Sequence, residues 1–207
     1  MAVVLIDYGA GNLHSVEKAF RHEAGNHDII VSHDTATVRK ASHIVLPGVG
    51  AFAACMKGLS AIPGMLDVLH EAVQEKQLPF MGICVGMQMM LDHSLEHGRH
   101  AGLGWIPGSV EPLKPSDSNL KIPHMGWNEL TFHQHHPASY GLESGRHAYF
   151  VHSYHAHCEN EDDVLATCDY GGTATAAIAR DNLVGTQFHP EKSKALGLAM
   201  IRNFMEM

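Results

Sequence analysis

The sequence predicts an α/β fold of three layers, with a mostly parallel central sheet flanked by helices and antiparallel strands added in the C-terminal half. In the first half, fully apolar runs typical of buried strands alternate with amphipathic helical segments, as in parallel sheets covered on both faces. In the second half, strand-like runs follow one another with short connections, which indicates antiparallel pairing. The chain has 207 residues and shows no internal repeat or linker, so we expect a single domain over residues 1–207.

The first half begins with an apolar run over residues 2–8, followed by a helical pattern over residues 12–24. Asn12 is a suitable N-cap for this helix, because its side chain can accept a hydrogen bond from the first turn. The pattern places Leu13, Val16, Phe20 and Ala24 on one face. Further along we expect strands over 27–33, 43–50 and 78–83, and a helix that opens at Pro63 with Met65, Leu69 and Val73 inward. The segment 86–94 has the pattern of a helix start, with Met87, Met90 and Leu91 inward.

The second half contains four runs with the composition of strands and one terminal helical pattern. The tetrapeptide Arg-Asp-Asn-Leu at 180–183 is typical of a hairpin turn. The strands are expected over 148–158, 163–171, 173–180 and 183–191, and the helix over 194–207, with Leu196, Met200 and Phe204 aligned on one face.

Composition excludes several classes of function. A net charge of −8 argues against nucleic acid or an anionic membrane as the main partner, since both attract clustered Lys and Arg. No apolar run approaches the ~18 residues of a membrane helix, and the N-terminus lacks the basic flank of a signal peptide. Four cysteines in a chain of this length do not resemble a disulfide framework, so we expect a reducing, cytoplasmic location.

The segment Gly-Ile-Cys-Val-Gly at residues 82–86 lies between a predicted strand and a predicted helix. This arrangement has the form of a nucleophile elbow with Cys84 as the nucleophile. Helix N–H groups favour the thiolate and can also receive an oxyanion. By itself the motif also suits a small buried hydrophobe. Three other cysteines have no such setting and are expected to be packing residues: Cys55, Cys158 and Cys168.

A nucleophilic cysteine needs a base and a group that orients the base. The chain has 18 histidines, so position has to discriminate between them. His189 and Glu191 lie two residues apart at the end of an apolar strand, where both side chains can project to the same side. Strand ends on the carboxyl side of an open α/β sheet are common sites of catalysis. The glycine turn at 47–50 also ends a strand, so Val49 or a neighbour can supply a second oxyanion donor.

Two motifs that would bind a cofactor or a metal are incomplete in this sequence. The segment Gly-Ala-Gly-Asn-Leu-His at 9–14 has His14 where a dinucleotide fingerprint needs its third glycine. Zinc deaminases follow H-x-E with a downstream P-C-x-x-C, but every cysteine here precedes His189. We expect no metal and no cofactor.

Taken together, several blocks resemble the class I glutamine amidotransferases: "GICVGMQ" at 82–88 and "QFHPEKS" at 187–193 carry the family pattern. Other blocks resemble one branch of this family, the glutaminase subunits of imidazole glycerol phosphate synthase in histidine biosynthesis: "DYGAGNLHSV", "LPGVGAF", "IPHMGWN", "YFVHSY" and "ATCDYG". These blocks cover essentially the whole chain. The resemblance implies that Cys84 attacks the side-chain amide of glutamine, that His189 moves the proton, and that Glu191 orients His189.

The resemblance also implies roles for further residues. The oxyanion rests on the amides of Val85 and, after a peptide rearrangement, Val49. Ammonia passes to a (β/α)8-barrel cyclase in a heterodimer, and the cyclase makes imidazole glycerol phosphate and AICAR. The residues implied to hold glutamine are Gly50, Gln88, His152, Ser153 and Tyr154, and those implied to face the cyclase are Asn12, Trp127 and Lys192.

Two alternatives stay open from the residues alone. The same scaffold can serve a stand-alone γ-glutamyl hydrolase or a cysteine peptidase. A metal-binding or interaction module is the second alternative, because His93, His97 and His100 have helix-compatible spacing and His133, His135 and His136 lie close together. The sequence departs from the family pattern at Val85, where leucine is usual, and at Thr175, where a bulkier apolar residue is expected.

Overall fold

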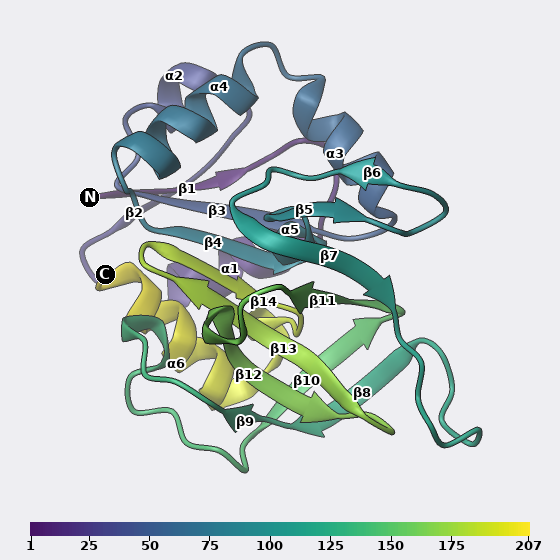
Figure 1. Cartoon of the computed structure of the whole chain (residues 1–207). Coiled ribbons are helices and arrows are strands. Elements are labelled where there is room, and N and C mark those ends of the chain that lie inside the picture. The colour runs from purple at the N-terminus through teal and green to yellow at the C-terminus, as the bar shows by residue number, and fades with distance from the viewer.

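The computed structural model describes the whole chain, residues 1–207, and its centre is an eight-stranded sheet (Figure 1). The strand order is β2-β1-β3-β4-β14-β13-β12-β9, in which the first five strands are parallel and the rest antiparallel. The predicted fold class is therefore confirmed. The strands of this sheet are β1 Ala2–Ile6, β2 Asp28–Ser32, β3 His43–Gly48, β4 Phe80–Cys84, β9 Thr131–Phe132, β12 Val164–Asp169, β13 Thr173–Arg180 and β14 Leu183–Thr186.

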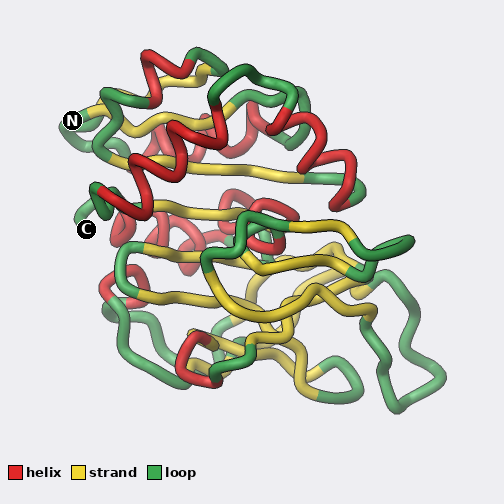
Figure 2. The backbone as a smooth tube through the Cα atoms, turned by 45° about the horizontal axis from the view of Figure 1, so that its top comes forward, coloured by secondary structure: helices red, strands yellow, loops and turns green.

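Helices cover both faces of the sheet (Figures 1 and 2). On one face α1 (Leu13–Glu23) packs against α6 (Lys194–Met205). On the other, α2 (Thr35–Val38) and α3 (Phe52–Ser60) pack against α4 (Met65–His70). This division follows from right-handed crossovers, since the chain moves in one direction through α1 and in the other through α2 to α4. Short helical turns lie at Glu71–Glu75, Pro137–Ser139, Glu161–Asp163 and Pro190–Lys192 (η4).

The buried faces of α1 and α6 are those that the sequence pattern predicts. Val16 and Phe20 of α1 are buried, and Phe20 meets Phe204 of α6 edge to face with 6.3 Å between ring centroids. Asn12 stands at the N-cap of α1, but its side chain makes no capping hydrogen bond.

No single helix is both long and apolar enough to cross a membrane. Only α3 together with the segment Met65–Glu75, bent by 97°, reaches that length and hydrophobicity as a pair.

A smaller sheet covers the C-terminal half of the central sheet. Its order is β11-β7-β5-β6, and β11 packs on β13. A separate ribbon pairs β10 with β8 (Figure 1). The strands are β5 Leu91–Ser94, β6 His100–Ala101, β7 Ile106–Pro112, β8 His124–Glu129, β10 His147–His152 and β11 Tyr154–Cys158.

The helix predicted to start in residues 86–94 is present, but it is much shorter than its apolar pattern suggests. Helix α5 spans only Val85–Gln88, and the chain then enters β5. The carbonyl groups of Met89 and Met90 accept hydrogen bonds from the segment 103–106 instead of continuing the helix. Met87, Met90 and Leu91 follow a helical i, i+3, i+4 spacing, but Met89 is as buried as they are, so this spacing does not distinguish a helix from a buried strand.

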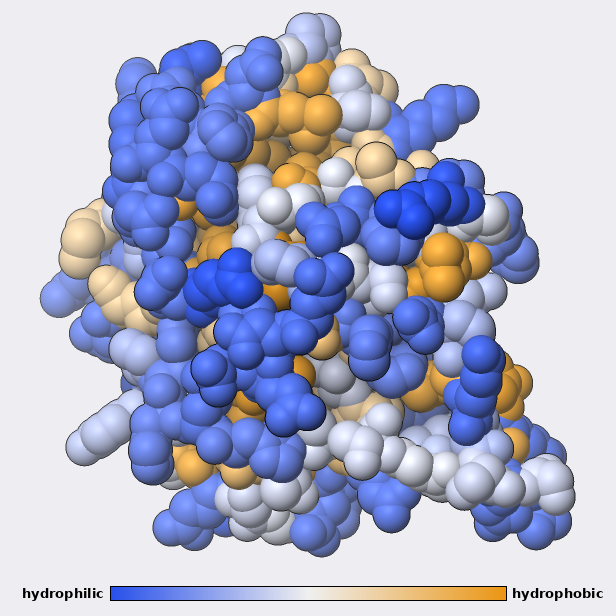
Figure 3. Space-filling model, in the orientation of Figure 1, coloured by the Kyte–Doolittle hydropathy of each residue, from blue (hydrophilic) through white to orange (hydrophobic).

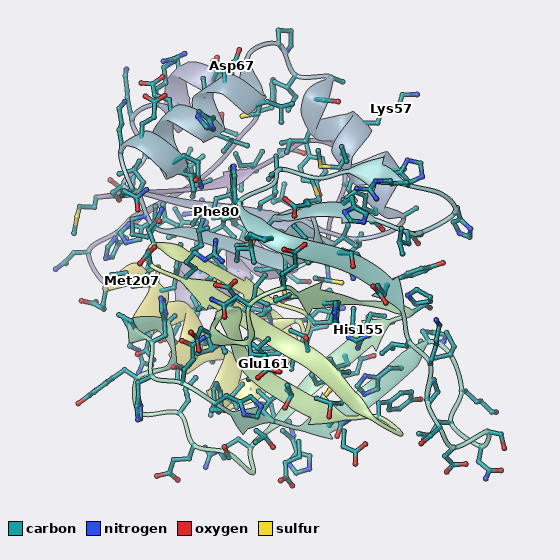
Figure 4. The ribbon with its side chains drawn as sticks, viewed as in Figure 1. Lys57, Asp67, Phe80, His155, Glu161 and Met207 are labelled. Carbon is teal, nitrogen blue, oxygen red and sulfur yellow. The ribbon has the colours of Figure 1, made fainter.

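The hydrophobic core is continuous between the layers. Phe80, at the start of β4, is fully buried and meets Trp105 edge to face at 4.9 Å. In Figure 4 it lies in the interior, whereas Lys57 and Asp67 project from the outer helical layer. The face seen in Figure 3 is mainly hydrophilic, with a hydrophobic area over α3 and α4.

Candidate active site

The carboxyl ends of three adjacent parallel strands bring distant segments of the chain together in the middle of the central sheet. In β3, β4 and β14 the register pairs Gly48 with Cys84 and Ile83 with Thr186. The residues that follow these strand ends must therefore lie side by side, although they come from positions near 49, 84 and 189. Ligand-binding and catalytic sites of open α/β sheets commonly lie at this carboxyl end of the parallel strands.

Cys84 occupies a strained turn between β4 and α5. Its backbone has φ +56° and ψ −112°, a conformation that costs about 1–3 kcal/mol for a residue with a Cβ. The glycines on both sides permit it: a Cβ on Gly82 would lie 2.5 Å from the Gly86 carbonyl oxygen, and a Cβ on Gly86 would lie 1.8 Å from that of Leu46. The turn has the geometry predicted for an elbow. Because α5 has only four residues, any stabilisation of a thiolate by this helix comes from local backbone amides rather than from a long helix dipole.

His189 and Glu191 form a buried pair beside this turn. Nδ1 of His189 lies 2.9 Å from Oε1 of Glu191, and the two side chains are 3% and 0% exposed. Burial by itself lowers the pKa of His189, but the neighbouring Cys84 sulfur and the Glu191 carboxylate raise it, to about 9 overall. The buried Nε2 has no hydrogen-bond partner. The ring is therefore fixed through Nδ1, and the raised pKa favours a proton on Nε2.

A pocket of about 340 Å³ opens in front of these groups. It contains Cys84 and His189, and its volume lies at the lower end of small-molecule sites. The sequence-predicted residues that line it with them are Val49, Gly50, Val85, Gln88, His152, Ser153 and Tyr154. Glu191 is the one predicted site residue of this group that lies behind the pocket wall rather than in it.

The two oxyanion candidates, Val49 and Val85, follow the ends of the adjacent strands β3 and β4. Val85 is the first residue of α5, so its N–H follows Cys84 directly in the chain. Val49 follows β3, is 40% exposed, and its carbonyl oxygen accepts a hydrogen bond from the Cys55 thiol at 3.5 Å. Gly50 follows with φ +99°. Cys55, Cys158 and Cys168 are buried and free, as expected of packing residues.

Two of the pocket residues, His152 and Gln88, already form hydrogen bonds within the protein. Both nitrogens of His152 are used: Nδ1 donates to the Tyr154 carbonyl at 2.9 Å and Nε2 accepts from Nδ1 of His124 at 2.9 Å. Burial keeps both rings neutral, with a pKa of about 3 for His152 and about 4 for His124. Gln88 donates through Nε2 to the Tyr154 carbonyl at 3.0 Å and to Oε1 of Gln187 at 2.9 Å. Its own Oε1 is then the atom left for a ligand.

An exposed apolar surface borders the pocket at β8. Pro123 lines the pocket, and Ile122, Met125 and Trp127 beside it are 46%, 62% and 46% exposed. Nζ of Lys194 lies 5.0 Å from the centre of the Trp127 ring. Lys192 is also exposed, with Nζ 5.8 Å from the Tyr149 ring centre. The loop that carries Asn12 reaches the same carboxyl end of the strands, since Gly11 approaches Pro47.

The structure adds residues that sequence reasoning missed. Glu96 lines the pocket, and its Oε2 accepts the Phe52 N–H at 2.6 Å; His124 and Gln187 support the pocket from behind. Gln187 and His124 carried a signal, because they lie within the blocks at 187–193 and 122–128, whereas Glu96 carried none. The spacing of His93, His97 and His100 is not helical, because these residues lie in β5, a turn and β6. No three His, Cys, Asp or Glu side chains converge on a metal-binding geometry.

Comparisons with known proteins give the class to which this site belongs. The family model described as glutamine amidotransferase class-I matches residues 4–207, and the chain belongs to this family. One crystal structure of a glutamine amidotransferase superimposes with a TM-score of 0.74 at 19% identity, covering 98% of this chain and 97% of that one. A glutamine amidotransferase from Thermotoga maritima gives a TM-score of 0.68 at 16% identity, covering 100% and 96%. These two likenesses concern the fold alone.

Curated relatives indicate one branch of this family. The imidazole glycerol phosphate synthase subunit HisH of Brucella suis biovar 1 (strain 1330) is 52% identical, over 100% of this chain and 99% of its own length. The proteins of the same name from Rhodospirillum rubrum and Cereibacter sphaeroides are 52% and 50% identical, and each pair covers 99% of this chain and 98% of the relative. The expected family and branch are thereby confirmed.

Proposed function

We propose that this protein is the glutaminase subunit of an imidazole glycerol phosphate synthase and hydrolyses glutamine through a thioester on Cys84. The observation that carries the proposal is the buried His189–Glu191 pair beside a cysteine held at a strained turn, all at one end of three adjacent strands. Cysteine nucleophiles act with such a base and orienting acid.

In the proposed reaction the thiol proton of Cys84 moves to Nε2 of His189, and the sulfur attacks the side-chain carbonyl carbon of glutamine. The tetrahedral oxyanion is held by the N–H of Val85 and, after rotation of its peptide, that of Val49. When the C–N bond breaks, His189 returns the proton to the departing nitrogen and ammonia leaves. Water, deprotonated by His189, then cleaves the thioester and releases glutamate.

The pocket offers groups for the two ends of glutamine. Oε1 of Gln88 and the carboxylate of Glu96 are acceptors suited to the α-ammonium group. Backbone amides of Gly50, Ser153 and Tyr154 are donors for the carboxylate and amide oxygen of the substrate. His152 belongs to the site as a residue that positions the Tyr154 carbonyl, because both of its ring nitrogens are engaged.

We further propose that the exposed surface at Ile122, Met125 and Trp127 binds a (β/α)8-barrel cyclase in a heterodimer, with Asn12 and Lys192 at its margin. An apolar surface at the mouth of the pocket supports this, since ammonia released there can pass into the partner before water protonates it. One continuous cluster of buried apolar side chains supports a single domain over 1–207. The four unpaired cysteines suit a cytoplasmic location.

The experiment is Cys84→Ala in the protein reconstituted with a cyclase and the nucleotide substrate of that cyclase. We expect synthesis from glutamine to be lost and synthesis from added ammonium salt to be retained, because only the ammonia source is removed. Synthesis from glutamine at the wild-type rate would overturn the role of Cys84. Cleavage of γ-glutamyl peptides by the isolated wild-type chain, without stimulation by the cyclase, would favour the stand-alone hydrolase.

A further inference from the structure

Gln187 is fully buried between β14 and the catalytic histidine, and the proposed mechanism gives it no task. Its side chain is 0% exposed, so its amide must find partners inside the protein. Nε2 lies 3.7 Å from Sγ of Cys84, within hydrogen-bonding distance for a sulfur acceptor. A polar group at this position touches the atom that attacks the substrate.

The direction of the Gln187 amide is fixed by a chain of hydrogen bonds. It begins at the Tyr154 carbonyl, which can only accept. Gln88 must therefore present its NH2 group to this carbonyl, at 3.0 Å. The second hydrogen of the same NH2 group points to Gln187, whose oxygen accepts it at 2.9 Å. With its oxygen turned towards Gln88, Gln187 necessarily turns its own NH2 group towards Cys84.

An N–H group that points at sulfur stabilises the thiolate more than the thiol, because hydrogen bonds to a charged acceptor are the stronger ones. The buried setting strengthens this preference, since the local dielectric constant is low. Gln187 keeps its protons throughout, while the thiol proton passes to His189. The thiolate is then held between an imidazolium and an amide N–H.

We propose that Gln187 is a catalytic residue that stabilises the thiolate of Cys84, and that Gln88 and the Tyr154 carbonyl position it. This inference rests on the proposed function for the use of the thiolate, but the hydrogen bond itself is independent of the substrate. It gives Gln88 a second task besides contact with glutamine. It also explains why a glutamine follows β14, two residues before His189.

The test measures the thiolate without glutamine. The full-length protein is alkylated with iodoacetamide at pH 7, and modification of the Cys84 peptide is followed by mass spectrometry, which separates it from Cys55, Cys158 and Cys168. For Gln187→Met, which fills a similar volume without a donor, we expect alkylation to slow about tenfold. Gln187→Glu has nearly the same shape as the native side chain, and its carboxylate repels the thiolate, so it should slow alkylation further.

Gln134→Met is the matched control, because Gln134 also donates an amide hydrogen bond, to the Asp162 carbonyl, but lies outside the pocket. It should react at the wild-type rate. Circular dichroism and thermal unfolding establish that each variant is folded. Wild-type alkylation rates in folded Gln187→Met or Gln187→Glu would overturn the inference.

The position of Gln88 is tested by Gln88→Met in the same assay. If Gln88 acts through Gln187, the double variant Gln88→Met, Gln187→Met should react no more slowly than Gln187→Met alone. Additive losses would contradict this part of the inference. A failure of the proposed function would appear elsewhere, as glutamine-dependent synthesis by Cys84→Ala, so the two failures are distinguishable.

Discussion

Replacing Glu191 with glutamine tests how the acid controls the catalytic histidine. The change removes one negative charge and keeps the shape. In the native pair, burial lowers the pKa of His189, while Cys84 and Glu191 raise it from 6.5 to about 9. This interval corresponds to about 3 kcal/mol in favour of the imidazolium. Without the carboxylate charge burial opposes the imidazolium more effectively, and the pKa of His189 should fall.

The neutral amide also disturbs the tautomer. If its NH2 group faces Nδ1 of His189, it donates to that nitrogen and forces the ring proton onto Nε2, which can then no longer accept the thiol proton. If its oxygen faces Nδ1, the NH2 group takes the place of Oε2 of Glu191, a buried atom with no hydrogen-bond partner. Both arrangements weaken the base, so kcat/KM for glutamate release should fall by about 10²- to 10⁴-fold.

Stability should change with pH in a defined direction. His189 has a folded-state pKa above its unfolded value, so its contribution is complete below about pH 6.5 and is lost as pH rises through about 9. The free energy of unfolding of the wild type, measured with urea, should therefore decline across this window, and Glu191→Gln should show a smaller decline. Unchanged kcat/KM together with an unchanged pH dependence of stability would refute this account of the pair.

Three further predictions concern the turn, the partner surface and the buried histidines. Gly86→Ala places a Cβ 1.8 Å from a carbonyl oxygen of β3, so glutaminase activity should be lost and the melting temperature lowered; wild-type values for both would contradict the packing. Trp127→Ala should weaken binding of the cyclase, measured by titration calorimetry, by at least about tenfold. Tyr140→Ala removes an exposed aromatic ring away from the pocket and should leave binding unchanged. Equal effects of the two substitutions would contradict the assignment of this surface. His152, with a pKa of about 3, should show no NMR titration between pH 5 and 8, and a midpoint inside that range would show that the ring is solvated.

The nucleophile turn and the histidine–acid pair could be predicted because each depends on neighbours close in the chain. Gly82, Cys84 and Gly86 define the turn locally, and His189 and Glu191 are two residues apart. Their convergence follows from the apolar runs, since buried parallel strands align their carboxyl ends. The structure has this arrangement, with Gly48 beside Cys84 in the register.

The polar network could not be predicted, because its contacts join residues far apart in the sequence. Gln88 and Gln187 are separated by 99 positions, and Gln88 and Tyr154 by 66. No local pattern marks such pairs. The extent of the helix after Cys84 could not be predicted for a different reason. Its methionines are buried on all sides, so the spacing of apolar residues could not distinguish a helix from a strand. The two-residue strands β6 and β9 are too short to show any alternation.

The central claim is that Cys84 carries the glutamyl group during turnover, and the most direct measurement is the mass of the enzyme during the reaction. The protein, bound to its cyclase and acceptor nucleotide, is mixed with glutamine and quenched in acid within the turnover time. We predict a mass increase of one γ-glutamyl group, located on the Cys84 peptide, labile to hydroxylamine and absent from Cys84→Ala. Turnover at the full rate with no adduct on Cys84, or with the adduct on another residue, would contradict the account.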